Sequence, residues 1–150
     1  MARAAVLGRL TWRPATVAAV RTESPSARTL TFDIDGWTVH VPGQHLDIRL
    51  TAPDGYAAYR SYSISSPPAP NRLEVTVQAV TGGEVSPYLV DVAEPGDQVE
   101  IRGPLGGWFV RRPDDRRPAL LVGGGSGVAP LMSMMRVATA PTRLVYSVRS

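Results

Sequence analysis

Between Pro14 and Val110, apolar and polar residues alternate in short runs that are separated by glycine, proline and other turn-forming residues. The runs 45–50 and 72–79 are the most regular, with an aliphatic residue at every second position. A period of two is typical of strands with one buried and one solvated face. Such closely spaced strands indicate an antiparallel barrel or sandwich. The predicted strands are Ala15–Thr22, Arg28–Ile34, Thr38–Val41, His45–Leu50, Tyr59–Ile64, Arg72–Val80 and Gln98–Arg102.

The pattern changes after the charged, proline-bounded segment 111–118, which we interpret as a linker. A strand at Ala119–Val122, a glycine turn, a helix at about Val128–Ala138 and a strand at Leu144–Val148 follow. This order predicts a βαβ unit with parallel strands. Two parallel strands with one helix leave apolar surface uncovered, so we expect the chain to be the front part of a longer protein.

Composition indicates a soluble globular protein, with 43% hydrophobic and 19% charged residues. The longest uncharged stretch, 118–135, is broken by glycines and prolines, so no membrane span is predicted. Arginines are scattered through the apolar N-terminus, which is not the pattern of a signal peptide. A cytoplasmic location is therefore expected.

The absence of cysteine excludes disulfides, thiolate metal sites and iron–sulfur ligation, and no metal centre is predicted. All 16 basic residues are arginine, which excludes a lysine Schiff base and the lysine of a phosphate-binding loop. The arginines are dispersed despite the net charge of +3, so no nucleic-acid interface is predicted. Any redox chemistry must therefore use a bound organic cofactor.

The glycine turn between the strand and the helix can bring backbone N–H groups close to a phosphate. The fingerprint G-x-G-x-x-G is only partly met, because Pro130 follows Gly125 and Gly127 where a third glycine would stand. Proline suits the first turn of a helix. A hydrolase with Ser126 as nucleophile is disfavoured, because Val128 occupies a required glycine position and both histidines precede the serine. These histidines, 40 and 45, are interpreted as barrel residues, and a turn that binds no ligand remains an alternative.

Two further stretches have the chemistry of a phosphate site. In "RSYS", Arg60 and Tyr62 share one strand face, so they can hold a phosphate and lie against a ring, whereas an exposed cross-strand pair is the alternative. Ser61 and Ser63 point to the other face unless the strand twists or ends there. In "GGEVS", Ser86 is predicted to cap a helix that starts at Pro87, after two glycines that permit close approach to an anion. The alternative here is an ordinary capped helix.

Taken together and in this order, "PGQH" (42–45), "RSYS" (60–63), "GGEVS" (82–86), "GPLGGWF" (103–109) and "GGGSGVAP" (123–130) resemble the ferredoxin–NADP reductase family. The resemblance implies a mainly β protein: an antiparallel Greek-key β-barrel that binds FAD, with FMN as the alternative, and a parallel α/β domain that binds NAD(P)H. The implied division is a tail at 1–13, the barrel at 14–110, a linker at 111–118 and an incomplete nucleotide-binding domain at 119–150.

The resemblance also implies roles for individual residues. Arg60 would contact a flavin phosphate, while Tyr62 on the ring or ribityl chain and Ser63 near the reactive nitrogen are the catalytic candidates. The remaining cofactor-binding candidates are Ser61 on the same strand, Gly82, Gly83 and Ser86 around the phosphates, and Gly125, Gly127 and Pro130 along the path of the nicotinamide cofactor.

The implied reaction is hydride transfer from NAD(P)H to flavin, followed by electron transfer to an acceptor protein or domain outside this chain. Arg149 near the end of the last strand favours NADPH over NADH, with a plain surface residue as the alternative. A non-catalytic flavin-binding or interaction module from a truncated or split reductase is the competing function. Because the family's second domain continues past its first βαβ unit, we expect this chain alone not to turn over NAD(P)H efficiently.

Overall fold

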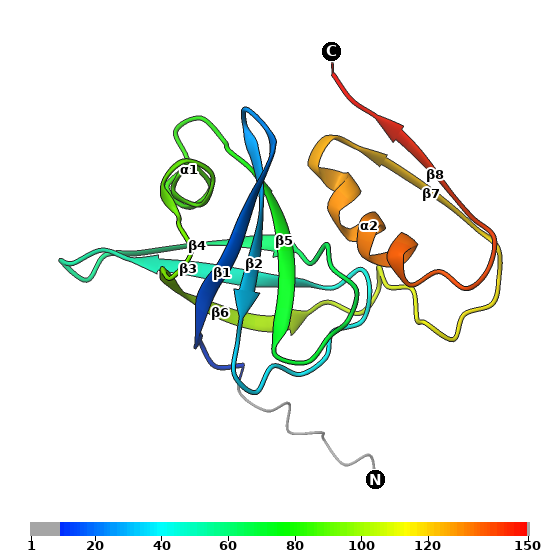
Figure 1. Cartoon of the computed structure of the whole chain (residues 1–150), viewed down its shortest axis with the longest axis horizontal. Helices are drawn as coiled ribbons and strands as arrows, with labels where there is room; N and C mark the ends of the chain where they lie inside the picture. Colours follow the sequence, from blue (N-terminus) through cyan, green and yellow to red (C-terminus); the bar gives the residue numbers. More distant parts are fainter. Residues whose placement is uncertain (1–9, 150) are drawn as a thin grey trace, which may run out of the picture.

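A computed structural model describes residues 10–149, and its larger part is an antiparallel barrel (Figure 1). Its six strands lie in the order β4-β3-β6-β1-β2-β5. Ile64, directly after β4, bridges Val75 of β5 and brings the two ends of the sheet together. Neighbouring strands are thus often distant in sequence, as the predicted Greek-key barrel requires. The strands are β1 (Arg13–Ser24), β2 (Ala27–Asp33), β3 (His45–Thr51), β4 (Ala57–Ser63), β5 (Arg72–Gln78) and β6 (Gln98–Leu105).

The core of the barrel is built by the alternation that the sequence shows. In β5, Leu73, Val75 and Val77 are buried while the residues between them face outward. Leu30 and Phe32 of β2 are completely buried in the same cluster. Each such side chain stabilises the fold by about 1.5–3 kcal/mol relative to an exposed position, so the barrel has a core of its own.

The strand predicted at Thr38–Val41 was wrong, because this segment forms a loop. The Val41 N–H donates to the side-chain oxygen of Gln44, and the Gln44 N–H donates to the Val41 carbonyl, which closes a turn before β3. His40 is buried instead of Val39, with its Nε2 3.2 Å from the Ser66 carbonyl oxygen. The segment therefore packs one polar side chain inward and cannot join a strand ladder.

One helical segment covers an end of the barrel with its apolar side chains. It begins as α1 (Val85–Pro87) and continues as a short π-helical turn, η1 (Tyr88–Val92). The predicted helix start was also wrong: the helix begins at Val85, and Ser86 is not its cap. The Ser86 hydroxyl instead accepts a hydrogen bond from the Val80 N–H at 3.0 Å, so it closes the turn before the helix.

The second region is the predicted βαβ unit. Strand β7 (Ala119–Gly124) leads through the 3-10 turn η2 (Gly125–Gly127) into α2 (Val128–Arg136), and β8 (Thr142–Ser147) returns parallel to β7. The parallel pairing is therefore confirmed. The boundaries of the linker and of the two domains stay predictions.

Helix α2 lies between the small sheet and the barrel (Figure 1). Its Ser133 hydroxyl donates to the Ser66 carbonyl at 2.7 Å, and its Arg136 guanidinium donates to the Ser65 carbonyl at 2.8 Å. Met134 comes so close to Gly43 that a Cβ on this glycine would lie 2.6 Å from Met134 Cε. The helix is thus attached to the segment that follows β4 and packs against the turn before β3.

The face of the small sheet that is turned away from α2 is apolar and open. Leu120, Val122 and Val145 have exposures of 64%, 67% and 53%. Strands of a complete parallel sheet are buried on both faces. In this unit α2 covers one face of the sheet and the other face is exposed. Within residues 10–149, no helix is long and apolar enough to cross a membrane.

Candidate functional site

A cavity of about 810 Å³ opens where β4 and β5 end, beside the loop 80–84 and the turn that begins α2. We call it the β4 cavity. It brings together most of the residues that the sequence singled out. The predicted residues that line it are Arg60, Ser61, Tyr62, Ser63, Gly82, Gly83, Ser86 and Gly127.

Arg60 presents an exposed guanidinium to this cavity. Its Nη1 donates to the Tyr59 carbonyl at 2.7 Å, the one hydrogen bond of this side chain to other residues in the described part of the chain. A guanidinium carries five N–H donors in a planar fork, so most of them can still bind a phosphate. The antiparallel register sets Arg60 opposite Ile48 of β3, which is buried in the core.

Tyr62 lies two residues further along the same strand and is half-buried. Its hydroxyl is buried without a hydrogen-bond partner among residues 10–149. Burial raises the pKa of Tyr62 to about 12, while the nearby Arg60 charge acts in the opposite direction. A buried hydroxyl without a partner destabilises the protein by about 1–3 kcal/mol. The neighbouring Ser86 hydroxyl also acts to lower the pKa of Tyr62.

Ser61 and Ser63 have different surroundings. The Ser61 hydroxyl donates to Asp47 of β3 at 2.6 Å, so its side chain holds β4 against β3 while the residue still borders the cavity. Ser63 is the last residue of β4 and is paired in register with His45. Because the strand ends here, Ser63 reaches the cavity that Arg60 and Tyr62 line.

Asp47 is buried, although its alternation in β3 placed it on the solvated face. Arg102 of β6 donates to it at 2.6 Å, and the Arg102 guanidinium lies 4.6 Å from the centre of the Trp12 ring. Burial acts to raise the pKa of Asp47, but the hydrogen bonds from Ser61 and Arg102 and the Arg102 charge outweigh it and hold the pKa below its usual value. Asp47 therefore acts as an ionised anchor behind β4.

The loop before α1 needs its glycines. Gly82 has φ +76°, a conformation that other residues rarely adopt. A Cβ on Gly83 would lie 3.0 Å from the Val80 carbonyl oxygen and 3.2 Å from the Ser86 hydroxyl. Glycine at both positions allows the tight turn and leaves its backbone open to a ligand.

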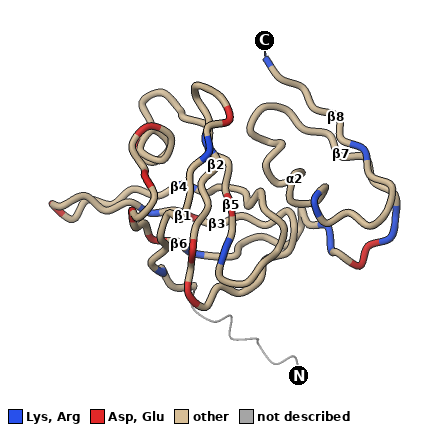
Figure 2. The backbone as a smooth tube through the Cα atoms, viewed as in Figure 1, with Lys and Arg blue, Asp and Glu red and all other residues tan. Residues whose placement is uncertain are grey.

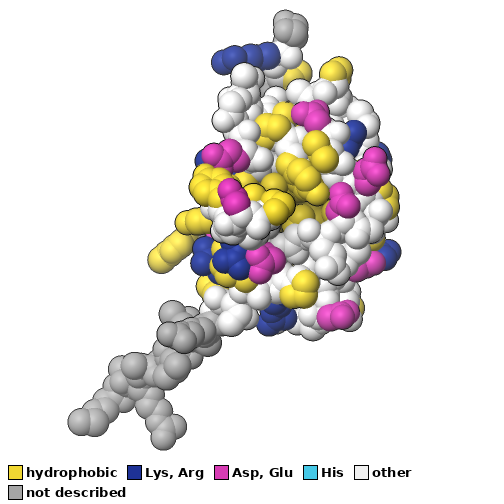
Figure 3. Space-filling model, turned by 90° about the vertical axis from the view of Figure 1, so that its left-hand side faces the viewer, with side chains coloured by type: hydrophobic (Ala, Val, Ile, Leu, Met, Phe, Trp, Pro, Cys, Tyr) yellow, Lys and Arg dark blue, Asp and Glu magenta, His cyan; other side chains and the backbone are white. Residues whose placement is uncertain are grey.

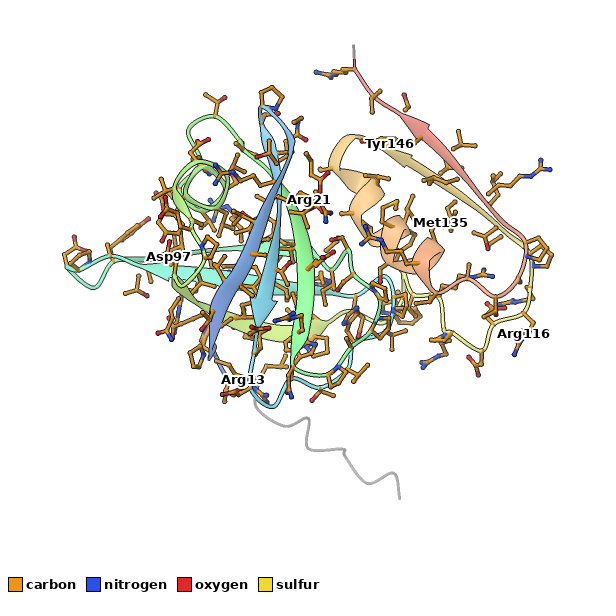
Figure 4. The ribbon with its side chains drawn as sticks, viewed as in Figure 1. Arg13, Arg21, Asp97, Arg116, Met135 and Tyr146 are labelled. Atoms are coloured by element: carbon orange, nitrogen blue, oxygen red, sulfur yellow. The ribbon has the colours of Figure 1, made fainter. Side chains whose placement is uncertain are left out.

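A second cavity of about 920 Å³ lies between the β1–β2 hairpin and the βαβ unit, and we call it the glycine-turn cavity. Two of the predicted cofactor-binding residues, Gly125 and Arg149, line it. Arg21 of β1 and Tyr146 of β8 also line it, from opposite sides (Figure 4). The Tyr146 hydroxyl donates to the Gly125 carbonyl at 3.0 Å and holds the glycine turn in place. Pro130 lines neither cavity; it is buried in the first turn of α2.

The two cavities share part of their lining. The residues common to both are Thr76, Gln78, Ser126 and Ala129. Ligands in the two cavities would therefore lie next to each other, at the end of β5 and the start of α2.

The sequence did not single out several residues of these cavities. Thr76 and Gln78 face outward from β5 directly before the glycine loop. Their polar side chains at the end of a predicted strand, next to a predicted phosphate site, are the signal by which they could have been found. Glu84 lies within the "GGEVS" stretch but was not given a role. Arg21 carries no local signal, because only the pairing of β1 with β2 brings it to the glycine-turn cavity.

Comparison with known proteins agrees with this geometry. Residues 14–110 match the family described as the oxidoreductase FAD-binding domain. A reductase component of the naphthalene 1,2-dioxygenase/salicylate 5-hydroxylase systems of Ralstonia sp. is 37% identical over 73% of this chain and 33% of its own length. An NADPH oxidoreductase of Mycobacterium tuberculosis is 38% identical over 78% of this chain and 32% of its own length.

The crystal structure of an Amycolatopsis cytochrome P450 reductase superimposes with a TM-score of 0.76 at 30% identity, covering 94% of this chain and 45% of that one. The fold thus defines a flavoprotein barrel with an attached βαβ unit. The chain belongs to the oxidoreductase FAD-binding domain family, and the predicted resemblance to ferredoxin–NADP reductases is confirmed. It spans about a third of the length of the curated relatives it matches.

Proposed function

We propose that this chain is the flavin-binding part of an NAD(P)H-dependent flavoprotein reductase, with the beginning of its nucleotide-binding domain. FAD would occupy the β4 cavity and the nicotinamide cofactor the glycine-turn cavity. The observation that carries the proposal is the shared wall of the two cavities, formed by Thr76, Gln78, Ser126 and Ala129. Hydride transfer requires two cofactors held side by side, which adjacent cavities provide.

The residues of the β4 cavity fit a flavin nucleotide. Arg60 and the glycine loop at 82–83 would hold its phosphates, because a free guanidinium and an open backbone both favour an anion. The ring of Tyr62 offers the cofactor a flat apolar surface in the cavity. Ser63 would orient the reactive part of the ring from the strand end. Bound FAD supplies the ability to accept a hydride and to release its two electrons to another protein.

The glycine-turn cavity carries the basic side chains Arg21, Arg136 and Arg149. We propose NADPH as the preferred donor, with Arg149 holding the 2′-phosphate, because the end of β8 offers an arginine where an acidic residue would suit NADH. In the segment 111–118, a pair of aspartates lies between two pairs of arginines (Figure 2). The electron acceptor would be a protein or domain outside this chain, and the expected location is the cytoplasm.

Replacement of Arg60 by alanine tests the proposal directly. FAD should bind the unchanged chain with quenching of flavin fluorescence. Arg60→Ala should weaken binding by about 10- to 100-fold, the equivalent of one charge-assisted hydrogen bond of roughly 1.5–3 kcal/mol. A fluorescence titration with FAD measures both dissociation constants.

Arg112→Ala is the matched control, because Arg112 is exposed and lines neither cavity. It should leave the FAD affinity unchanged, and both variants should unfold at the same urea concentration as the unchanged chain. If the folded chain takes up no FAD, the proposed function is wrong. If Arg60→Ala binds FAD as tightly as Arg112→Ala does, the role of Arg60 is wrong.

A further inference from the structure

We propose that His40 makes the docking of α2 on the barrel sensitive to pH, so that protonation of its imidazole loosens the βαβ unit from the barrel. The side chain is 2% exposed and belongs to the loop 38–44 that precedes β3. The inference concerns the junction of the two regions and does not depend on which ligands the cavities bind.

At this junction, one carbonyl oxygen joins the loop, the segment after β4 and α2. His40 Nε2 lies 3.2 Å from the Ser66 carbonyl oxygen, and the Ser133 hydroxyl of α2 donates to the same oxygen at 2.7 Å. A carbonyl oxygen only accepts hydrogen bonds, so Nε2 carries the ring proton and Nδ1 of the neutral imidazole has a free lone pair. Nδ1 is buried and has no hydrogen-bond partner among residues 10–149.

Protonation of His40 adds an N–H donor and a positive charge at Nδ1, where the described part of the chain offers no acceptor. A buried charge and a buried donor without a partner are both unfavourable, so the docked state resists protonation. Burial accordingly lowers the pKa of His40, while its hydrogen bond to Ser66 acts to raise it. The imidazolium therefore gains hydration only when the loop 38–44 moves away from Ser66.

Movement of this loop affects α2 because the two are in direct contact. A Cβ on Gly43 would lie 2.6 Å from Met134 Cε of α2, so the helix packs closely on the turn of the loop. The Arg111 N–H donates to the Pro42 carbonyl at 2.9 Å and ties the start of the segment 111–118 to the same turn. Displacement of the loop therefore weakens the contact between α2 and the barrel.

The charged side chains on the elements packed around this junction do not offset the cost of protonation. Arg136 of α2 donates to the Ser65 carbonyl at 2.8 Å and lies 3.4 Å from the carboxylate of Glu74 on β5. Arg111 donates to a carbonyl of its own segment. The pKa of His40 is set by burial and by its backbone hydrogen bond, with no contribution from these charges.

The range from pH 7.5 to pH 5.5 isolates this effect. The chain has two histidines, 40 and 45, and histidine is the side chain whose ordinary pKa lies in that range. Carboxylates, such as those around the hydrophobic patch on the side of the barrel remote from α2 (Figure 3), have ordinary pKa values of about 4.

The sign of the pH dependence follows from the lowered pKa of His40. The pKa of an imidazole in the open state is about 6.5. Docking is therefore unaffected above about pH 7 and weakens as the pH falls below that value. If the docked state binds no proton, the open state is favoured about tenfold more at pH 5.5 than at pH 7.5.

Amide hydrogen exchange at pH 7.5 and pH 5.5, corrected for the intrinsic exchange rate, tests the inference. The protection factors of α2 should fall about tenfold at the lower pH, while those of β2 and β5 stay constant. His40→Gln retains a donor for the Ser66 carbonyl but cannot titrate, so its α2 protection should be the same at both pH values. His45→Gln is the matched control and should show the same fall as the unchanged chain.

His40→Phe is a second variant that fills the buried position without a titrating group, and its α2 protection should likewise not depend on pH. Circular dichroism at both pH values shows whether each variant keeps its fold. Constant α2 protection in the unchanged chain overturns the inference, as does an equal fall in the unchanged chain and in a folded His40 variant. Both results leave FAD binding, and with it the proposed function, unaffected.

Discussion

The barrel and the βαβ unit differ in how completely they bury their apolar residues. Val75 of β5 is completely buried in the barrel, whereas Val122 of β7 is 67% exposed on the open face of the small sheet. Both are valines in the middle of a strand. A valine in the middle of a strand therefore contributes different amounts to the free energy of unfolding in the two regions, because its burial depends on what the rest of the fold places against the strand.

The two regions also contribute differently to the hydrophobic core and to the proposed cofactor site. The core cluster of the barrel runs from Ala15 to Ile101 and contains no residue of α2, β7 or β8. The βαβ unit depends on the barrel through α2, where Ser133 and Arg136 bond to the carbonyls of Ser66 and Ser65. The unit that completes the proposed site is therefore outside the barrel core and docks on the barrel through α2.

The largest expected effect compares the two valines. Val75→Ala should reduce the free energy of unfolding by about 2–3 kcal/mol, because it removes two buried carbon atoms and leaves a cavity. Val122→Ala should change it by less than about 0.5 kcal/mol, as exposed substitutions do. Urea unfolding followed by tryptophan fluorescence measures both. Equal losses would mean that the open face of β7 is buried in solution.

A smaller effect concerns the ionised anchor behind β4. Asp47→Asn should lower stability by about 1–2 kcal/mol at pH 7, since it weakens charge-assisted hydrogen bonds to Ser61 and Arg102. The pKa of Asp47 is lowered in the folded state, so its contribution is fully present above the unfolded pKa of about 4 and is lost as the pH falls through the lower folded value.

Unfolding curves of both proteins at several pH values measure this dependence. The two stabilities should differ by a constant amount from pH 7 to pH 5 and converge only in more acidic solution. A difference that persists unchanged in strong acid would show that the Asp47 charge does not stabilise the barrel.

The smallest effect concerns the attachment of α2. Ser133→Ala removes the hydrogen bond to the Ser66 carbonyl, and His40 remains beside that oxygen. We expect a local loss of about 1 kcal/mol, so that amide hydrogens of α2 exchange about fivefold faster while those of β2 and β5 do not change. Ser126→Ala, at an exposed position of the same unit, is the control. Faster exchange throughout the barrel would show that the two regions unfold together.

Much of the fold follows from local patterns. The alternation in β3 and β5 and the succession of strand, glycine turn and helix from Ala119 to Arg136 predict these elements to within a few residues. The candidate residues Arg60, Tyr62 and Gly82 were also found from short motifs, since spacing along one strand or turn decides which side chains share a face.

Contacts between residues that are distant in sequence depend on the tertiary structure and could not be predicted from local patterns. The burial of Asp47 depends on Arg102, which is 55 positions away, and the bond between Tyr56 and Glu84 spans 28 positions. The loop at residues 38–41 buries His40 because Ser66 lies beside it. The sequence by itself determined the strands, the turns and the motif residues, because these depend on neighbours along the chain. Only the closure of the barrel and the docking of α2 decided which charges meet and where the two cavities join, because those contacts arise between strands that are distant in sequence.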